Sequence, residues 1–257
     1  TRNHSSAASD VYKRQMNALL LKAITAWRLG VVNIGRVLWY RFGVRFGLNP
    51  VKKISEAVPV GPFFHKPVEQ EPTPIPPLPF ELRAFGRSAD FPSERGVPLW
   101  NHSVLTGVKA DQDSWWKLPD FVDSLGDIKG VWEASRFDWV FGFAKQSLAG
   151  EDNALSQLNE WLADWCNKNP PYIGVNWKCG QEASIRVMHL AMAGHILGQV
   201  HNPAPGLLDM LRVHLRRIAP TIQYAIAQDN NHGTSEAGAL FIGCLLYTSP
   251  SPRDIGE

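Results

Sequence analysis

The 257-residue sequence lacks the motifs that would place it in several large classes of enzyme. It contains no Gly-rich phosphate loop, no dinucleotide-binding fingerprint, no serine nucleophile elbow and no His-Glu-x-x-His motif. Its 26 basic and 24 acidic residues nearly balance, so overall charge gives no argument for a nucleic-acid partner. We therefore expect no cofactor and no nucleic acid.

Cysteine is scarce, with three residues in the whole chain. Within the central part, Cys166 and Cys179 offer neither a disulfide framework nor the spacing of metal ligands, and free thiols are favoured over a single bridge. His189, His195 and His201 would point to different sides of a helix. We expect no metal site.

Long uninterrupted hydrophobic runs are also missing. The segment over 16–48 is apolar, but lysine and arginine residues interrupt it before it could cross a bilayer. It also lacks the cleavage site of a signal peptide. A basic amphipathic helix on a membrane surface is one interpretation. A helix packed on its own protein is favoured. No transmembrane segment is expected, and localisation stays open.

Both ends of the chain resemble translated sequencing adapters. Ser5 to Gln15 resembles a transposase adapter, and Cys244 to Asp254 resembles the opposite adapter. We expect the native sequence to run from Met16 to Gly243 and the gene to have continued beyond it. The expected organisation is an adapter-like artefact over 1–15, a basic helix region over 16–67, a proline-rich connector over 68–79, a truncated helical domain over 80–243 and a second artefact over 244–257.

The pattern along the chain predicts a mainly α fold with an irregular N-terminal region. Proline density makes 68–79 extended, and 80–107 is broken by Gly and Pro, with room for one or two short strands. Apolar residues at helical spacing follow from Asp127 onward. Predicted helices cover 155–165, ended by Asn169-Pro170-Pro171, then Gln181 to Leu197, Pro205 to Ile218, Thr221 to Ala227, and a last one with Thr234 as N-cap. Short connections between them favour stacked helical hairpins.

The cluster Asn230-Asn231-His232, followed by Gly233, is the most unusual polar segment. It would lie at a helix N-terminus, where backbone N–H groups and the helix dipole favour anions. The same field would keep His232 neutral and able to accept a proton. The alternative is a capping turn with no further role.

Two further segments carry polar groups within helical patterns. Glu133 and Arg136 have the spacing of a helix-surface ion pair, and so do Glu182 and Arg186. Such pairs explain the charges without any ligand, so this interpretation stays open beside a binding role. The ten tryptophans either fill the core or stack on sugar rings, which makes carbohydrate a possible ligand.

Taken together, three stretches resemble the N-terminal domain of the heparinase II/III-like polysaccharide lyases. They are Asp127 to Phe137, Asn169 through Asn176-Trp177 to Arg186, and Arg217 through Ile222 to His232. The resemblance implies an incomplete α/α toroid, followed in the family by a β-sandwich domain that is missing here. It implies β-elimination at a uronic acid of an acidic polysaccharide, which is glycosaminoglycan-, alginate- or bacterial surface-polysaccharide-like. A periplasmic or extracellular location is implied as well.

The resemblance also implies roles for individual residues. Asn231 would bind and neutralise the substrate carboxylate, and His232 would act as base or as a second carboxylate donor. Candidates for the substrate cleft are Asn230, Arg136, Asn176, Trp177, Glu182 and Arg186. The family's catalytic tyrosine lies downstream of the Asn-His pair, so this polypeptide itself is expected to have little or no lyase activity. The alternatives are a non-catalytic carbohydrate-binding helical domain and a helical scaffold that binds protein partners through Trp115-Trp116 or the N-terminal helix.

Overall fold

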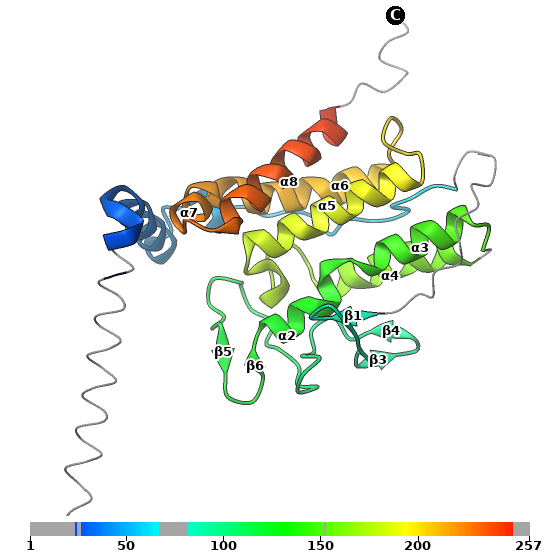
Figure 1. Cartoon of the computed structure of the whole chain (residues 1–257), viewed down its shortest axis with the longest axis horizontal. Helices are drawn as coiled ribbons and strands as arrows, with labels where there is room; N and C mark the ends of the chain where they lie inside the picture. The colour runs from blue at the N-terminus through cyan, green and yellow to red at the C-terminus, as the bar shows by residue number, and fades with distance from the viewer. Residues whose placement is uncertain (1–23, 25–26, 67–81, 152, 249–257) are drawn as a thin grey trace, which may run out of the picture.

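The chain folds into a mainly helical protein, seen in a computed structural model (Figure 1). The structure describes residues 24, 27–66, 82–151 and 153–248. The proline-rich connector predicted over 68–79 therefore lies outside the described residues, as does most of each adapter-like end. The mainly α fold class predicted from the sequence is confirmed.

The helices follow one another closely along the second half of the chain. A first helix covers 27–46 and is followed by the short 3-10 helix η1 (Pro50–Lys52). The later helices are α2 (Lys129–Trp132), η2 (Glu133–Arg136), α3 (Trp139–Leu148), α4 (Ala154–Lys168), η3 (Val175–Trp177), α5 (Gly180–Ile196), α6 (Pro205–Ile218), η4 (Ala219–Thr221), α7 (Ile222–Ala227) and α8 (Asn231–Thr248).

Consecutive long helices pack against each other in pairs. Helix α3 packs on α4, α5 on α6, and α7 on α8, while α5 also contacts α3 and α8 (Figure 1). Helix α5 thus lies at the centre of the helical layer, which explains why it is apolar on most faces. The packed pairs agree with the predicted helical hairpins, and closure of such pairs into a toroid stays a prediction.

Helix boundaries follow the local signals of the sequence in most places. Helix α6 has the predicted bounds, α5 begins one residue early at Gly180, and α4 ends where Asn169 takes a non-helical backbone. The helical pattern predicted from Asp127 onward is confirmed by α2, η2 and α3. A break that was not predicted falls at Phe137, whose φ of 67° ends η2 before α3 begins.

Three two-stranded antiparallel hairpins lie beside α2 and on the side of α3 and α4 that faces away from α6 and α8 (Figure 1). They pair β1 (Arg83–Ala84) with β2 (Arg87–Ser88), β3 (Ser93–Glu94) with β4 (Val97–Pro98), and β5 (Phe121–Val122) with β6 (Gly126–Asp127). The prediction of one or two strands in 80–107 was too low, because each strand is only two residues long and too short to show an alternating pattern. The β5–β6 hairpin was not predicted.

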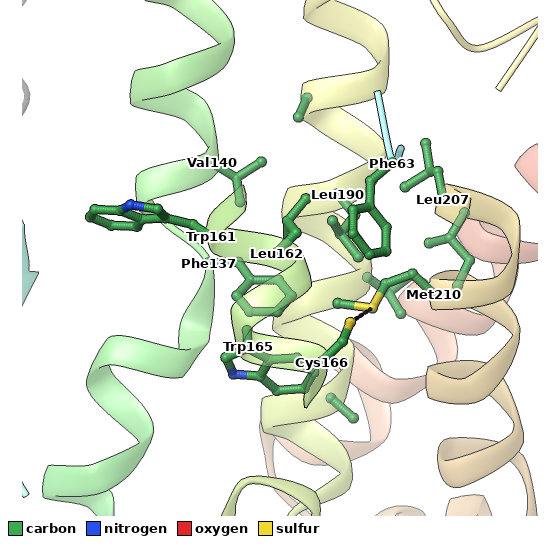
Figure 2. Packing of buried hydrophobic residues seen from close by; sticks show 14 of the residues in the cluster. Phe63, Phe137, Val140, Trp161, Leu162, Trp165, Cys166, Leu190, Leu207 and Met210 are labelled. Atoms are coloured by element: carbon green, nitrogen blue, oxygen red, sulfur yellow. Dashed lines mark hydrogen bonds between the residues drawn. The ribbon is translucent and has the colours of Figure 1, made fainter. Parts of the chain in front are cut away.

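The main core lies among α3, α4, α5 and α6. Phe137, Leu162 and Leu190 pack between the helices, and Phe63 from the N-terminal segment fills the space beside Leu207 (Figure 2). The backbone N–H groups of Phe63 and of its neighbour donate to Asn159 of α4, which ties this segment to the helices. Most tryptophans are therefore core residues, as the simpler interpretation of their abundance predicted.

Helix α8 continues past Gly243, the predicted end of the native sequence, to Thr248. Leu246 from this last part is buried in the main core cluster. The division of the chain at residues 15 and 243 remains a prediction.

Candidate functional site

The site is a cleft of about 770 Å³ where the first helix, η1, the segment over 115–120 and the N-terminal ends of α5 and α8 meet. Its basic lining residues are Arg41, Arg45, Lys52, Lys117, Lys178 and Arg217. Its aromatic lining residues are Tyr40, Trp115, Trp116, Trp132 and Tyr224. Such a mixture of cations and flat aromatic faces suits an anionic ligand that also has ring surfaces.

Acidic side chains do not cancel the positive charge of the cleft. The lining holds two carboxylates, those of Asp120 and Glu236. Asp120 lies 3.1 Å from the ammonium of Lys178, and Glu236 lies 3.6 Å from the imidazole of His232. The remaining cations leave the lining with a net positive charge, which attracts polyanions and is weakened by salt.

Arg217 is the best-anchored cation of the cleft. It is 2% exposed, and its guanidinium donates to the carbonyl oxygens of Trp177 and Lys178, each at 2.7 Å. Its guanidinium carbon also lies 3.9 Å from the ring centroid of Trp115. Burial lowers the pKa of Arg217, but the two carbonyl groups and the aromatic face stabilise its charged form. The cleft therefore has a fixed cation at its base.

A second cation–aromatic pair lies close to the first. The ammonium of Lys52 is 5.3 Å from the ring centroid of Trp116, and the rings of Trp115 and Trp116 meet edge to face. The sequence suggested Trp115-Trp116 as a possible protein-binding feature. The structure places both rings in the cleft lining, beside Lys52 and Arg217, and a protein-binding role for them stays a prediction.

His232 lies in the first turn of α8 and lines the cleft. Helix α8 begins at Asn231, and the side-chain oxygen of Asn230 accepts the backbone N–H of His232 at 2.9 Å, so Asn230 caps the helix. The prediction that the Asn-His pair lies at a helix N-terminus is confirmed. The prediction that Thr234 is the N-cap was wrong, because Asn230 takes that place and Thr234 lies inside the helix.

The expectation of a neutral His232 was also wrong. Hydrogen bonding to Cys179 and to Glu236 raises the pKa of His232 to about 9, so the imidazole is a cation at neutral pH. His232 is therefore suited to donate a hydrogen bond to an anion rather than to accept a proton.

Gly180 allows this arrangement of side chains. A β-carbon at Gly180 would lie 2.6 Å from a carboxylate oxygen of Glu236, closer than any real contact of that kind. Glu236 itself is 3% exposed, and its second oxygen has no hydrogen-bond partner among the described residues. The absence of a side chain at the start of α5 therefore makes room for Glu236 beside His232.

Asn230 and Asn231, the neighbours of His232, lie outside the cleft lining. Both are exposed, and Asn230 uses its side chain to cap α8. The backbone carbonyl of Asn231 accepts from the hydroxyl of Ser235 within the same helix. Of the three residues in the Asn-Asn-His cluster, His232 is the one that the structure brings into the cleft.

Arg136 joins two buried carboxylates. It makes paired hydrogen bonds of 2.8 Å each to the carboxylate oxygens of Glu182, and it also contacts Glu133. The other oxygen of Glu133 accepts the backbone N–H of Phe85 at 2.6 Å. The predicted pair of Glu133 with Arg136 is confirmed, although Glu133 is only 4% exposed. The predicted pair of Glu182 with Arg186 was wrong, because the buried Glu182 pairs with Arg136 instead.

Asn176, Trp177 and Arg186 lie in the protein interior behind the cleft. Asn176 is fully buried, and its amide donates to Trp100, Asn101 and Asn169. Arg186 has no exposed surface, and burial lowers its pKa to about 10. In this structure none of these three side chains lines the cleft, and they hold its walls in place.

The guanidinium of Arg186 is enclosed by aromatic rings. Its carbon lies 5.1 Å from the ring centroid of Trp165 and 5.4 Å from that of Trp177. Its Nε donates to His214 at 2.8 Å, which fixes His214 as an acceptor, and burial keeps the pKa of His214 well below its usual value. Arg186 thus joins α5 to α6 through a neutral histidine.

Several cleft residues were not found from the sequence. Tyr40, Arg41 and Arg45 come from the first helix, whose return to the start of α8 no local pattern predicts. The ring of Tyr40 stacks on that of Tyr224 with centroids 4.0 Å apart, and burial raises the pKa of Tyr40 to about 12. The basic residues of the first helix were visible, but their position against the cleft was not.

Within the part of the chain that the structure describes, no group of three or more His, Cys, Asp or Glu residues could hold a metal ion. Comparison of the chain with protein-family models, curated proteins and solved structures finds no match. The resemblance to the heparinase II/III-like lyases therefore stays a prediction, and the function must be argued from the cleft.

Proposed function

We propose that the cleft binds a uronate-containing acidic polysaccharide and that the chain is part of a lyase that cleaves this polymer by β-elimination. The observation that carries the proposal is the joining of fixed cations and aromatic faces in one cleft of about 770 Å³. Carboxylates of the polymer would pair with the exposed cations, and a sugar ring would lie on Trp116, the one cleft tryptophan among the described residues that is not buried. In the same proposal, the packed helix pairs form part of an α/α toroid.

His232 would contact the carboxylate of the bound uronate, and the buried charge of Arg217 would attract the carboxylate from behind the cleft surface. Both line the cleft, and the pKa of about 9 for His232 keeps its imidazole charged at neutral pH. An ionised carboxylate makes the neighbouring C–H a very weak acid, so neutralising its charge is the first requirement of β-elimination. The raised pKa of His232 supports the role of carboxylate donor rather than the role of base.

A non-catalytic carbohydrate-binding function is the second candidate. It is favoured by the raised pKa values of His232 and Tyr40, because both groups hold their protons at neutral pH and neither is a base there. The substrate-binding part of the proposal is common to both candidates. They differ in whether the bound polymer is cleaved.

Binding is tested with the whole chain and oligouronates of defined length. Arg45→Ala and Lys52→Ala each remove one cation of the cleft, and Arg87→Ala removes an exposed arginine from the β1–β2 hairpin as a matched control. Each cleft variant should weaken binding by about fivefold to tenfold at low salt, as lost ionic contacts do. Equal effects of all three variants would show that attraction to the cleft is not specific.

Cleavage is tested with the protein translated from the uninterrupted gene, because the resemblance implies little or no turnover by this polypeptide itself. The same oligouronates are used, and the ultraviolet absorbance of an unsaturated uronate is followed. A lyase should lose turnover by two or more orders of magnitude in His232→Ala while still binding through the other cations. Asn231→Ala tests the neighbouring residue, which lies outside the cleft lining in this structure. Binding without any absorbance change would favour the non-catalytic function.

A further inference from the structure

The helix over 27–46 carries a large apolar surface that faces away from the protein. Beyond Gly30, whose φ of 73° breaks the regular helix, its most exposed apolar residues are Val31, Val32, Leu38, Trp39, Phe42 and Phe46, here called the apolar stripe. Val31 is 85% exposed and Trp39 is 71% exposed, and Trp27, before Gly30, is 84% exposed. Soluble proteins rarely leave so many large apolar side chains contiguous and uncovered, so this surface calls for a ligand.

The stripe occupies one side of the helix and has basic residues along its edges. At about 100° per residue, its six members fall within one arc of about 120° of the helical circumference, with Arg36 beyond one edge and Arg41 and Arg45 beyond the other. Arg28, before Gly30, adds one more positive charge, and the sequence from 27 to 46 contains no acidic residue. The partner of this surface should therefore be both apolar and negatively charged.

The opposite side of the helix is already occupied. Tyr40 stacks on Tyr224, Val44 packs against the main core, and Gly43 lies close to Asn49. These contacts fix the rotation of the helix about its axis. The stripe cannot turn inward without breaking them, so it remains available to an outside partner.

An anionic lipid surface fits these features best. Tryptophans favour the boundary between lipid headgroups and acyl chains, and arginines pair with lipid phosphates. A second copy of the chain would present the same arginines and bring like charges together. No helix in the described residues is long and apolar enough to cross a bilayer, so the helix would lie along the surface.

We propose that the helix over 27–46 binds the surface of an anionic bilayer, with the apolar stripe inserted at the headgroup boundary. The inner side of the same helix supplies Tyr40 and Val44 to the cleft. Membrane binding would thus hold the cleft next to the lipid surface. This proposal is independent of the identity of the ligand in the cleft.

Vesicle sedimentation of the full chain tests the proposal. Vesicles of phosphatidylcholine alone are compared with vesicles of equal parts phosphatidylcholine and phosphatidylserine. The double variant Trp39→Ser with Phe42→Ser removes part of the stripe, and Phe121→Ser, a 63% exposed aromatic of the β5–β6 hairpin, is the matched control. A second double variant, Arg28→Gln with Arg36→Gln, tests the charge. Circular dichroism and thermal unfolding report the folding of each variant.

The protein should sediment with the anionic vesicles and stay in solution with the neutral ones. The serine double variant should lower the partition coefficient at least tenfold. The glutamine double variant should lower it about thirtyfold, or about fivefold for each arginine. Phe121→Ser should bind like the unchanged protein.

Three results would overturn the proposal. The first is an absence of sedimentation with either kind of vesicle. The second is an equal loss of binding in Phe121→Ser, which would indicate general stickiness. The third is evidence that protein covers the stripe. That evidence would be a dimer in solution that the stripe substitutions dissociate, or a large fall in the melting temperature of the serine double variant.

Discussion

Replacing Arg136 with methionine should destabilise the fold by about 3 kcal/mol, because it leaves two buried carboxylates without their cation. Arg136 bonds both oxygens of Glu182 and contacts Glu133, and the two glutamates are each 4% exposed. Methionine keeps much of the apolar stem of arginine, so the change removes charge rather than volume. The prediction separates a structural role for Arg136 from the substrate-binding role inferred from sequence.

The magnitude follows from the bonds that are lost. Breaking a buried ion pair by removing one partner costs about 3–5 kcal/mol. The lower end applies because the side chain of Arg136 is 31% exposed and because Glu133 keeps its bond from the backbone of Phe85. Water entering the space left by the guanidinium can solvate Glu182 in part.

Urea unfolding followed by circular dichroism measures the effect. Arg87→Met, at an exposed arginine of β2, is the control and should change stability by less than about 0.5 kcal/mol. Adding Glu133→Gln and Glu182→Gln to the Arg136 variant should restore much of the loss, since no uncompensated charge then remains buried. A loss below about 1 kcal/mol in Arg136→Met would refute the structural role.

Three further predictions concern single groups. The His232 imidazole should titrate near pH 9 by NMR in the folded protein, and at lower pH in Cys179→Ala. Because folding raises its pKa, the charged imidazole stabilises the fold fully below about pH 6.5, and this stabilisation is lost as the pH rises through 9. An NMR midpoint near pH 6.5 would contradict the raised pKa. Asn176→Ala should lower the free energy of unfolding, measured in urea, by about 1–3 kcal/mol, because three buried acceptors lose their hydrogen-bond donor. An unchanged urea midpoint would contradict this structural role of Asn176. Cys166 is buried, and burial raises the pKa of its thiol to about 12, so it should resist a charged thiol reagent until the protein unfolds. Mass spectrometry of the peptide that contains Cys166 measures the modification. Rapid modification of the native protein would contradict the buried position.

Local signals in the sequence predicted the long helices well. Pro205 begins α6 and Asn169 ends α4, because proline suits the first turn of a helix and the Asn-Pro-Pro sequence cannot continue one. Thr234 was a plausible cap by residue type, but Asn230 is an equally good one and lies nearer to the chain reversal at Asp229, whose φ is 51°. Local preference alone could not choose between them.

The site was harder to predict because its residues come from distant parts of the chain. His232 was found from an unusual polar cluster, but its charge depends on Cys179 and Glu236, which only the packing of α5 on α8 brings together. Arg186 and Asn176 have the polar side chains expected of a binding site, yet they are buried and bonded within the protein. The residue types showed that these side chains are polar. The tertiary structure is needed to tell a polar side chain that lines the cleft from one that hydrogen-bonds inside the protein.

The most direct test of the central proposal is the NMR signal of the His232 imidazole during titration with an oligouronate, compared with a neutral oligosaccharide of equal length. Ligand in the cleft should shift this signal saturably with the uronate and much less with the neutral sugar. The exposed His195 on α5, outside the cleft lining, is the internal control and should not shift. An unchanged His232 signal, or equal shifts with both sugars, would contradict the binding of an acidic polysaccharide in this cleft.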